Sequence, residues 1–216
     1  MNSNLTEIVF ILDRSGSMAG LEGDTIGGFN AFVEKQKKEE GEALLSAVLF
    51  SDREQVLYDR VDLRKVEPMT EAQYQVGGCT ALLDAIGGAV HHIGNVHKYA
   101  REEDRPAKTV FVITTDGMEN ASRRYSYQDV QRMVKHEQEK YGWEFLFLGA
   151  DMDAISAARS FGIRSDRAVR YYKDGSGTEL NYSILSQTVG KIRKGERIEA
   201  DWSKDIAEDF HRKYRG

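Results

Sequence analysis

The chain alternates short apolar runs with longer segments in which apolar residues recur every three or four positions. Apolar runs of this length, bounded by turn residues, are typical of strands buried on both faces of a parallel sheet. A further segment mixes apolar and charged residues after a turn, which indicates an antiparallel strand at a sheet edge. The predicted strands are residues 8–12, 43–50, 55–61 (the edge strand), 109–114, 143–148 and 168–172.

Apolar residues at helical spacing predict amphipathic helices between most of these strands. The longest is expected to open at Thr80, which is placed to act as its N-cap, and Ser126 is placed to cap another. Asp151, which follows the fifth strand, is expected to cap the next helix. The predicted helices are residues 24–39, 80–98, 126–140, 154–161 and 180–194, with a loop at residues 174–177.

Buried strands that alternate with helices favour an α/β fold. We expect a doubly wound, Rossmann-like domain over residues 1–194, with a mainly parallel six-stranded sheet and helices on both faces. The expected strand order is 3-2-1-4-5-6, with one antiparallel strand at the edge. Residues 195–216 form a C-terminal extension in which Trp202, Ile206 and Phe210 mark a short amphipathic helix. This helix is expected to pack on the domain, and docking to a partner is the alternative.

Net charge, cysteine content and the length of the apolar runs exclude some kinds of partner and some cellular compartments. The net charge of −5 gives no electrostatic case for nucleic acid or for an anionic membrane. A single cysteine, Cys79, excludes an internal disulfide and fits a reducing compartment. No signal-like start and no apolar run near the ~18 residues of a membrane span occur, so we expect a cytoplasmic protein.

Oxygen-bearing side chains gather where the predicted strands end. Asp13, Ser15 and Ser17 follow the first strand, Thr80 follows a Gly-Gly pair, and Asp116 follows the fourth strand. In a doubly wound sheet the first and fourth strands are neighbours, and the crevice between their carboxyl ends is the usual ligand site. We therefore expect these five side chains to converge there.

This donor set predicts a hard divalent cation. Carboxylates and hydroxyls without histidine or cysteine favour Mg²⁺, with Mn²⁺ or Ca²⁺ as alternatives, over Zn²⁺. Two carboxylates at most balance the charge of such an ion, and the other donors are neutral. The cation therefore stays electrophilic and keeps room for a carboxylate or a phosphate from outside the chain.

Taken together, Asp-x-Ser-x-Ser after an apolar strand, a Thr after Gly-Gly, and a later Thr-Asp-Gly resemble the von Willebrand factor A (VWA) domain and its metal-ion-dependent adhesion site (MIDAS). The resemblance spans about residues 5–194. It implies that Asp13, Ser15 and Ser17 supply the first loop of the site, Thr80 the second and Asp116, often through water, the third. It also implies a final ligand from an Asp or Glu of a partner protein.

The lone cysteine and the absence of a signal make the chain similar to intracellular bacterial or phage members of that family rather than to adhesion receptors. Several such relatives work beside ATPases, so an ATPase-associated complex is a candidate partner. The sequence thus predicts a metal-dependent protein-binding module and not an enzyme. We expect no partnership with nucleic acid or membrane.

Two other functions stay open at this stage. An Asp after the first strand is also the nucleophile position of haloacid-dehalogenase-like Mg²⁺ phosphatases and phosphotransferases. Those enzymes usually carry a second Asp two residues later, where this chain has Ser15. A nucleotide-binding loop of the Gly-x-x-x-x-Gly-Lys-Ser/Thr type is absent, and no histidine follows a predicted strand to act as a base. A metal-free scaffold is the remaining alternative.

Neighbouring residues have simpler interpretations. Glu119 and Asn120 are expected to be solvated loop residues, and the alternative is that they hold the loop or lie beside a partner surface. Arg14 is expected to be an outward charge, and the alternative is that it screens the site or meets an acidic partner. Cys79 is expected to be a small half-buried residue. The adjacent His91 and His92 lie on different faces of a helix and cannot chelate one ion together.

Overall fold

The computed structural model describes residues 1–150 and 153–215, so Asp151 and its expected capping role lie outside the described residues. Its sheet has six strands in the order β3-β2-β1-β4-β5-β6, as predicted. The strands are β1 (Asn2–Asp13), β2 (Glu42–Phe50), β3 (Glu54–Asp62), β4 (Pro106–Thr115), β5 (Glu144–Ala150) and β6 (Ala168–Tyr171).

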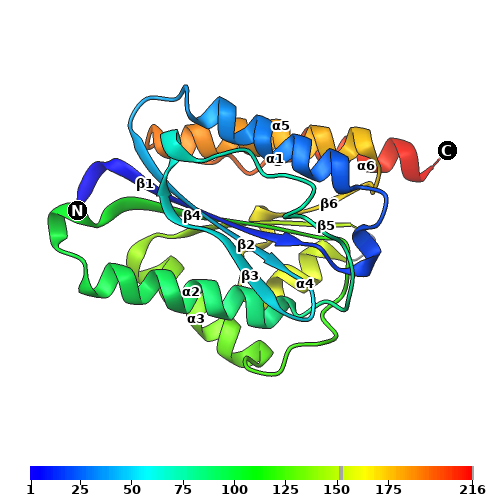
Figure 1. Ribbon diagram of the computed structural model, residues 1–216, viewed down its shortest axis with the longest axis horizontal. Coiled ribbons are helices and arrows are strands. Elements are labelled where there is room, and N and C mark those ends of the chain that lie inside the picture. The colour runs from blue at the N-terminus through cyan, green and yellow to red at the C-terminus, as the bar shows by residue number, and fades with distance from the viewer. Residues whose placement is uncertain (151–152, 216) are drawn as a thin grey trace.

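Helices cover both faces of this sheet. In Figure 1, α1, α5 and α6 lie above the sheet and α2, α3 and α4 lie below it. The helices are α1 (Glu22–Gln36), α2 (Leu82–Tyr99), α3 (Tyr127–Tyr141), α4 (Ala154–Ser160), α5 (Gly175–Arg193) and α6 (Lys204–Tyr214). The doubly wound α/β class predicted from the sequence is confirmed.

Strand β1 is the centre of the sheet. It pairs in parallel with β2 on one side and with β4 on the other, while β3 pairs antiparallel with β2 at the edge. Successive side chains of a strand point to opposite faces. Phe10 therefore packs in the core beneath α1 and α5, and Ile11 packs in the core beneath α2 and α3.

Strand β1 begins at Asn2, before its apolar run, and this added part contains a buried ionic group. Glu7 is fully buried on this strand. Its Oε2 accepts a hydrogen bond of 2.9 Å from Arg60 Nε and lies 3.3 Å from His97 Nε2. A charge that is paired in this way can be buried, and an apolar run cannot reveal it.

The observed starts of three helices can be compared with the starts predicted from the sequence. Ser126 caps α3 as predicted, in a capping box with Asp129. Helix α2 begins at Leu82 after Ala81, so the expectation that Thr80 caps it was wrong. Helix α5 begins at Gly175 instead of residue 180, because the Asp174 side chain accepts a 2.6 Å hydrogen bond from Gly177 N and starts a helix that two glycines disfavour.

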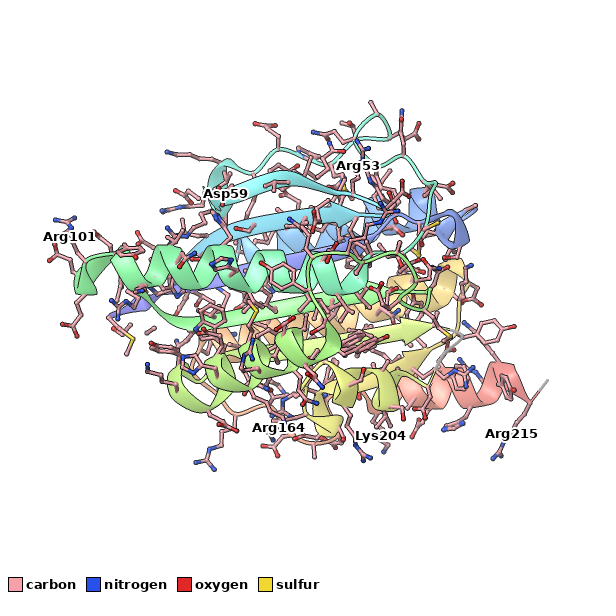
Figure 2. The ribbon with its side chains drawn as sticks, turned by 90° about the horizontal axis from the view of Figure 1, so that it is seen from below. Arg53, Asp59, Arg101, Arg164, Lys204 and Arg215 are labelled. Atoms are coloured by element: carbon pink, nitrogen blue, oxygen red, sulfur yellow. The ribbon has the colours of Figure 1, made fainter. Side chains whose placement is uncertain are left out.

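The C-terminal segment lies against the domain. Ile206 and Phe210 of α6 are buried, and Trp202 Nε1 donates a 2.9 Å hydrogen bond to the main-chain oxygen of Asp166. Figure 2 shows charged side chains around the outline of the molecule, from Arg101 at one end to Arg215 at the other. Within residues 1–150 and 153–215, none of the helices has both the length and the apolar character needed to cross a membrane.

Candidate metal site at the carboxyl ends of the strands

The first loop of the site leaves the sheet at its centre. Asp13 is the last residue of β1, and a single 3-10 turn, Gly16–Met18, follows it. The loop is fastened to the Gly-Gly segment by two main-chain hydrogen bonds, Gly16 N to Gly78 O at 3.0 Å and Gly77 N to Arg14 O at 2.9 Å. These bonds bring Thr80 beside the first loop although the two are far apart in sequence.

Asp13 is buried and held from two sides. Its Oδ1 accepts a 2.7 Å hydrogen bond from Ser15 N, and its Oδ2 accepts one of 2.6 Å from the hydroxyl of Thr115. Burial raises the pKa of Asp13, and the nearby charge of Asp116 adds to this, while the Thr115 and Ser15 hydrogen bonds oppose it. A nearby cation would favour the ionised form of this carboxyl group.

The hydroxyls of the first loop reach the third loop. Ser15 Oγ lies 3.0 Å from Ser17 Oγ, and Ser17 Oγ donates a 2.5 Å hydrogen bond to Asp116 Oδ1. Ser15 and Asp116 are buried, whereas Ser17 is exposed. Direct hydrogen bonds thus link Asp13, Ser15, Ser17 and Asp116, four of the five residues that the sequence proposes as metal ligands.

Thr80 is the fifth, and main-chain hydrogen bonds fix its position. Thr80 N donates to Asn120 Oδ1 at 2.9 Å, and Asn120 N donates to Thr80 O at 3.0 Å. The close approach of the loops shows at Gly117, where a β-carbon would lie 2.8 Å from Thr80 Oγ1 and 3.3 Å from Ser17 Oγ. Any residue other than glycine at this position would displace the Thr80 hydroxyl.

Two residues around the site hold its loops in place, and for Glu119 this is the role that the sequence left open as an alternative. Glu119, expected in solvent, accepts hydrogen bonds from the main-chain nitrogens of Leu83, Ala121 and Ser122 at 2.7–3.0 Å, so it ties the third loop to the start of α2. The Tyr74 hydroxyl donates to the main-chain oxygen of Asp13.

The structure also tests the expectations for Cys79 and for the two adjacent histidines, His91 and His92. Cys79 is exposed rather than half-buried, and its main-chain nitrogen donates a 2.7 Å hydrogen bond to Asp52 Oδ1. His91 and His92 are exposed on α2, which confirms that they lie on the helix surface.

Lys173, in the loop between β6 and α5, also reaches the site. Its Nζ lies 2.7 Å from Asp116 Oδ2 and donates a hydrogen bond to the main-chain oxygen of Ser17. Nothing in the sequence near Lys173 indicates this contact, because β6 lies two strands away from β4. The contact exists only through the fold.

The donor set fits a hard cation. In residues 1–150 and 153–215 no cluster of three or more His, Cys, Asp or Glu side chains is arranged to hold a metal. A cation at these loops would therefore depend on two carboxylates together with the hydroxyls of Ser15, Ser17 and Thr80. Oxygen donors of this kind suit Mg²⁺, Mn²⁺ or Ca²⁺.

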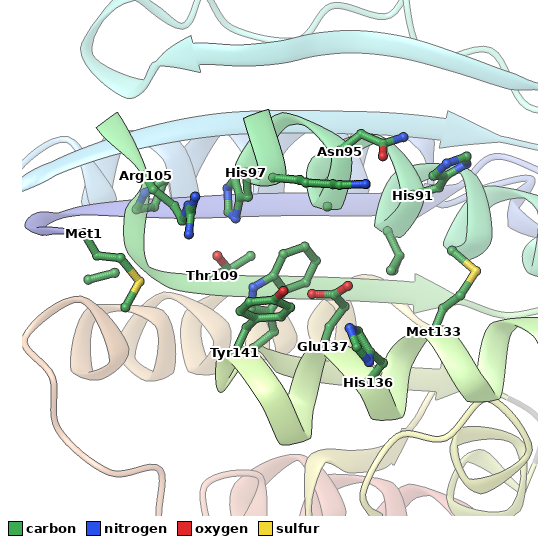
Figure 3. A pocket seen from close by; sticks show the side chains of 16 residues that line it. Met1, His91, Asn95, His97, Arg105, Thr109, Met133, His136, Glu137 and Tyr141 are labelled. Atoms are coloured by element: carbon green, nitrogen blue, oxygen red, sulfur yellow. The ribbon is translucent and has the colours of Figure 1, made fainter. Parts of the chain in front are cut away.

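A separate pocket of about 240 Å³ lies between α2 and α3 (Figure 3) and is lined by none of the five predicted site residues. His97 enters it from α2 and Glu137 from α3. Burial raises the pKa of Glu137, while the charges of His136, His97 and Lys140 lower it. This pocket is not part of the candidate metal site.

No protein-family model and no curated relative matches the sequence. Solved structures do match the fold. Proximal thread matrix protein 1 from the mussel byssus, solved with a zinc-occupied MIDAS motif, superposes with a TM-score of 0.58 at 16% identity over 86% of this chain and 46% of its own. The ArnB paralog VWA2 from Sulfolobus acidocaldarius gives 0.53 at 17% identity, over 88% of this chain and 45% of its own.

The chain has the von Willebrand factor A fold. BatB from Bacteroides thetaiotaomicron also superposes, with a TM-score of 0.52 at 14% identity over 88% of this chain and 99% of its own. The chain spans under half the length of the mussel and archaeal proteins. In this VWA fold the residues Asp13, Thr80 and Asp116 occupy the three loops at which the sequence motifs placed a metal site.

Proposed function

We propose that this VWA domain binds a divalent cation, Mg²⁺ in the first instance, and through it an acidic side chain of a partner protein. Asp13, Ser15, Ser17 and Thr80 would hold the cation, with Asp116 behind them. When bound, the cation supplies a positive charge with a coordination position open to a carboxylate from outside. The chain's own residues orient the donors and hold the three loops together.

One observation carries the proposal. Contacts of 2.5–3.0 Å join four residues of the site in a chain, Asp13 to Ser15 N, Ser15 Oγ to Ser17 Oγ, and Ser17 Oγ to Asp116 Oδ1. The last contact joins segments that are about a hundred residues apart in sequence. Polar groups are buried at a cost unless they are satisfied. Among the residues that the structure describes, Lys173 is the ammonium that contacts these carboxylates. When both Asp13 and Asp116 are ionised it offsets one of their two negative charges, and a divalent cation would offset both.

The surface around the site fits a protein partner. Met118, next to Gly117 on the third loop, is 70% exposed. A single exposed apolar side chain is common on protein surfaces, but one on this loop is accessible to a partner that binds at the proposed cation. We propose a partner that offers an Asp or Glu to the cation and an apolar group to Met118.

The setting proposed for this module is a cytoplasmic bacterial complex, such as one built around an ATPase. We assign no catalytic step to the loops. The Asp13 carboxylate accepts hydrogen bonds from the Thr115 hydroxyl and from the main-chain nitrogen of Ser15. Ser15 stands where a phosphatase of the haloacid-dehalogenase type carries its second Asp. The mussel structure with its zinc-occupied MIDAS motif supports a divalent cation in this fold.

Replacement of Asp13 tests the metal site. With Mg²⁺ or Mn²⁺ about 100-fold above its dissociation constant, the wild type should gain ~2.7 kcal/mol of stability. For a chain of this size that corresponds to about 5–10 °C in Tm. Asp13→Asn should lose this shift in thermal melts while it keeps the fold, because asparagine has the same shape and removes a buried charge.

The matched control is Asp205→Asn, an exposed Asp on α6 that should keep the full shift. Acetate then tests the open coordination position. Added to Mn²⁺-loaded protein, it should lower the relaxation enhancement of water protons as carboxylate replaces bound water. A metal shift that survives in Asp13→Asn would refute the proposed site.

A further inference from the structure

The ammonium group of Lys173 lies at the site where the divalent cation is proposed to bind. Its Nζ contacts Asp116 Oδ2 at 2.7 Å and the main-chain oxygen of Ser17. The Asp116 side chain is fully buried, and that of Lys173 is 26% exposed. Asp116 Oδ2 makes no hydrogen bond of standard geometry, so the charge of Lys173 is what balances this oxygen.

Charge balance makes the two cations alternatives at Asp116. Asp13 and Asp116 together carry two negative charges when ionised, and the ammonium of Lys173 offsets one of them. A divalent cation offsets both, and an ammonium left 2.7 Å from Asp116 would then face that cation at close range. Repulsion between like charges is strong where the surroundings exclude water, as they do at the buried side chain of Asp116.

We propose that Lys173 is a built-in competitor for the divalent cation, and that it must leave Asp116 when the site is loaded. This inference rests on the proposed function and adds its regulation. Lys173 lowers the affinity of the site for metal, and it keeps the buried Asp116 paired when no metal is bound.

The position of Lys173 connects this exchange to the C-terminal helices. The next residue, Asp174, caps α5 and contacts Lys213 Nζ of α6 at 2.9 Å. Lys213 also contacts Asp209 at 2.8 Å. These contacts hold the start of α5 in place next to Lys173. When Lys173 leaves Asp116, we therefore expect its flexible side chain to move and the helix to stay.

Substitution of Lys173 tests the competition by calorimetric titration with Mn²⁺. Lys173→Met keeps the length of the side chain and removes its charge, and it should bind Mn²⁺ about 10-fold more tightly than the wild type, within the range typical of coupled sites. Lys173→Arg keeps the charge and should bind close to wild type. Lys191→Met, at an exposed lysine of α5, removes the same net charge elsewhere and should leave the affinity unchanged within about twofold.

Melting temperatures supply a second readout that separates competition from a purely structural role. Without metal, Lys173→Met should melt below the wild type, since Asp116 loses its counter-charge; with saturating Mn²⁺ the difference should shrink or reverse. A loss of melting temperature in Lys173→Met that is equal with and without Mn²⁺ would overturn the inference about Lys173. Mn²⁺ binding by Lys173→Met that is unchanged or weaker would do the same. Either result would leave the proposed metal site standing. If neither protein binds Mn²⁺ in a manner that depends on Asp13, the metal site fails and this inference fails with it.

Discussion

Asp84 shows how one carboxylate organises a loop beside the site. It lies in the first turn of α2 and is 8% exposed. Its two oxygens accept hydrogen bonds of 2.9 Å from the main-chain nitrogens of residues 123, 124 and 125. Burial alone would raise the pKa of Asp84, but these hydrogen bonds outweigh it and the pKa is lowered.

Removal of this carboxylate should destabilise the protein in a pH-dependent way. We expect Asp84→Ala to lower the free energy of unfolding by about 3 kcal/mol at neutral pH, because three main-chain donors lose a charged acceptor. Because the pKa of Asp84 is lowered in the folded state, its carboxylate stabilises the folded protein at pH values above the ordinary pKa of 3.8. This stabilisation is lost as the pH falls through the folded-state pKa. Urea denaturation at several pH values measures it.

The difference between wild type and Asp84→Ala should therefore be constant at neutral pH and become smaller below about pH 4. Asp201→Ala, at an exposed Asp, is the control and should have little effect at any pH. A difference that grows on acidification would contradict the assigned role of Asp84.

At the scale of elements, local chemistry fixed some boundaries and the fold fixed others. Helix α3 begins where its sequence says, since Ser126 and Asp129 exchange hydrogen bonds within one turn. Helix α5 begins at Gly175, earlier than propensity predicts, because Asp174 caps it and Lys213 from another helix holds Asp174. Both caps act within one turn, but Gly175 and Gly177 weaken the helical pattern at the start of α5, so its sequence did not reveal the earlier start.

Loss of the α3 cap should cost a modest amount of stability. Ser126→Ala removes the acceptor for Asp129 N and should lower stability by about 1 kcal/mol, or about 2–4 °C in Tm. Differential scanning calorimetry measures this shift. Ser156→Ala, an exposed serine within α4, should change Tm little; equal effects of the two substitutions would argue against a capping role.

The molecule as a whole has a hydrophobic core on each face of the sheet, and α6 completes one of them. Ile206 is 1% exposed and belongs to the core beneath α1 and α5. Trp202 and Ala207 pack at the edge of the same core. The C-terminal segment therefore contributes to the stability of the domain.

Truncation of one α6 side chain measures this contribution. Ile206→Ala should lower the free energy of unfolding by about 2–5 kcal/mol, through lost burial and the cavity left behind. Urea denaturation followed by circular dichroism tests it, with the exposed Glu208→Ala as control. A loss under about 0.5 kcal/mol would indicate that α6 does not pack on the core in solution.

The sequence by itself determined the α/β class, the strand order and the identity of the edge strand. The physical reason is that apolar runs, helical periodicity and short connections leave few topologies for a parallel sheet. It also named Asp13, Ser15, Ser17 and Asp116, because the carboxyl ends of neighbouring strands must lie together. It named Thr80 from the Gly-Gly motif that precedes the second predicted helix. Their role as metal ligands stays a proposal, and Asp13→Asn tests it.

Tertiary structure alone decided what surrounds those residues. Thr115 holds Asp13, Glu119 holds the start of α2, and Lys173 balances Asp116. Each contact joins residues that are far apart in sequence, and each depends on side-chain directions and distances that no local pattern encodes. The sequence thus named the candidate residues, while the fold decided which charges face them.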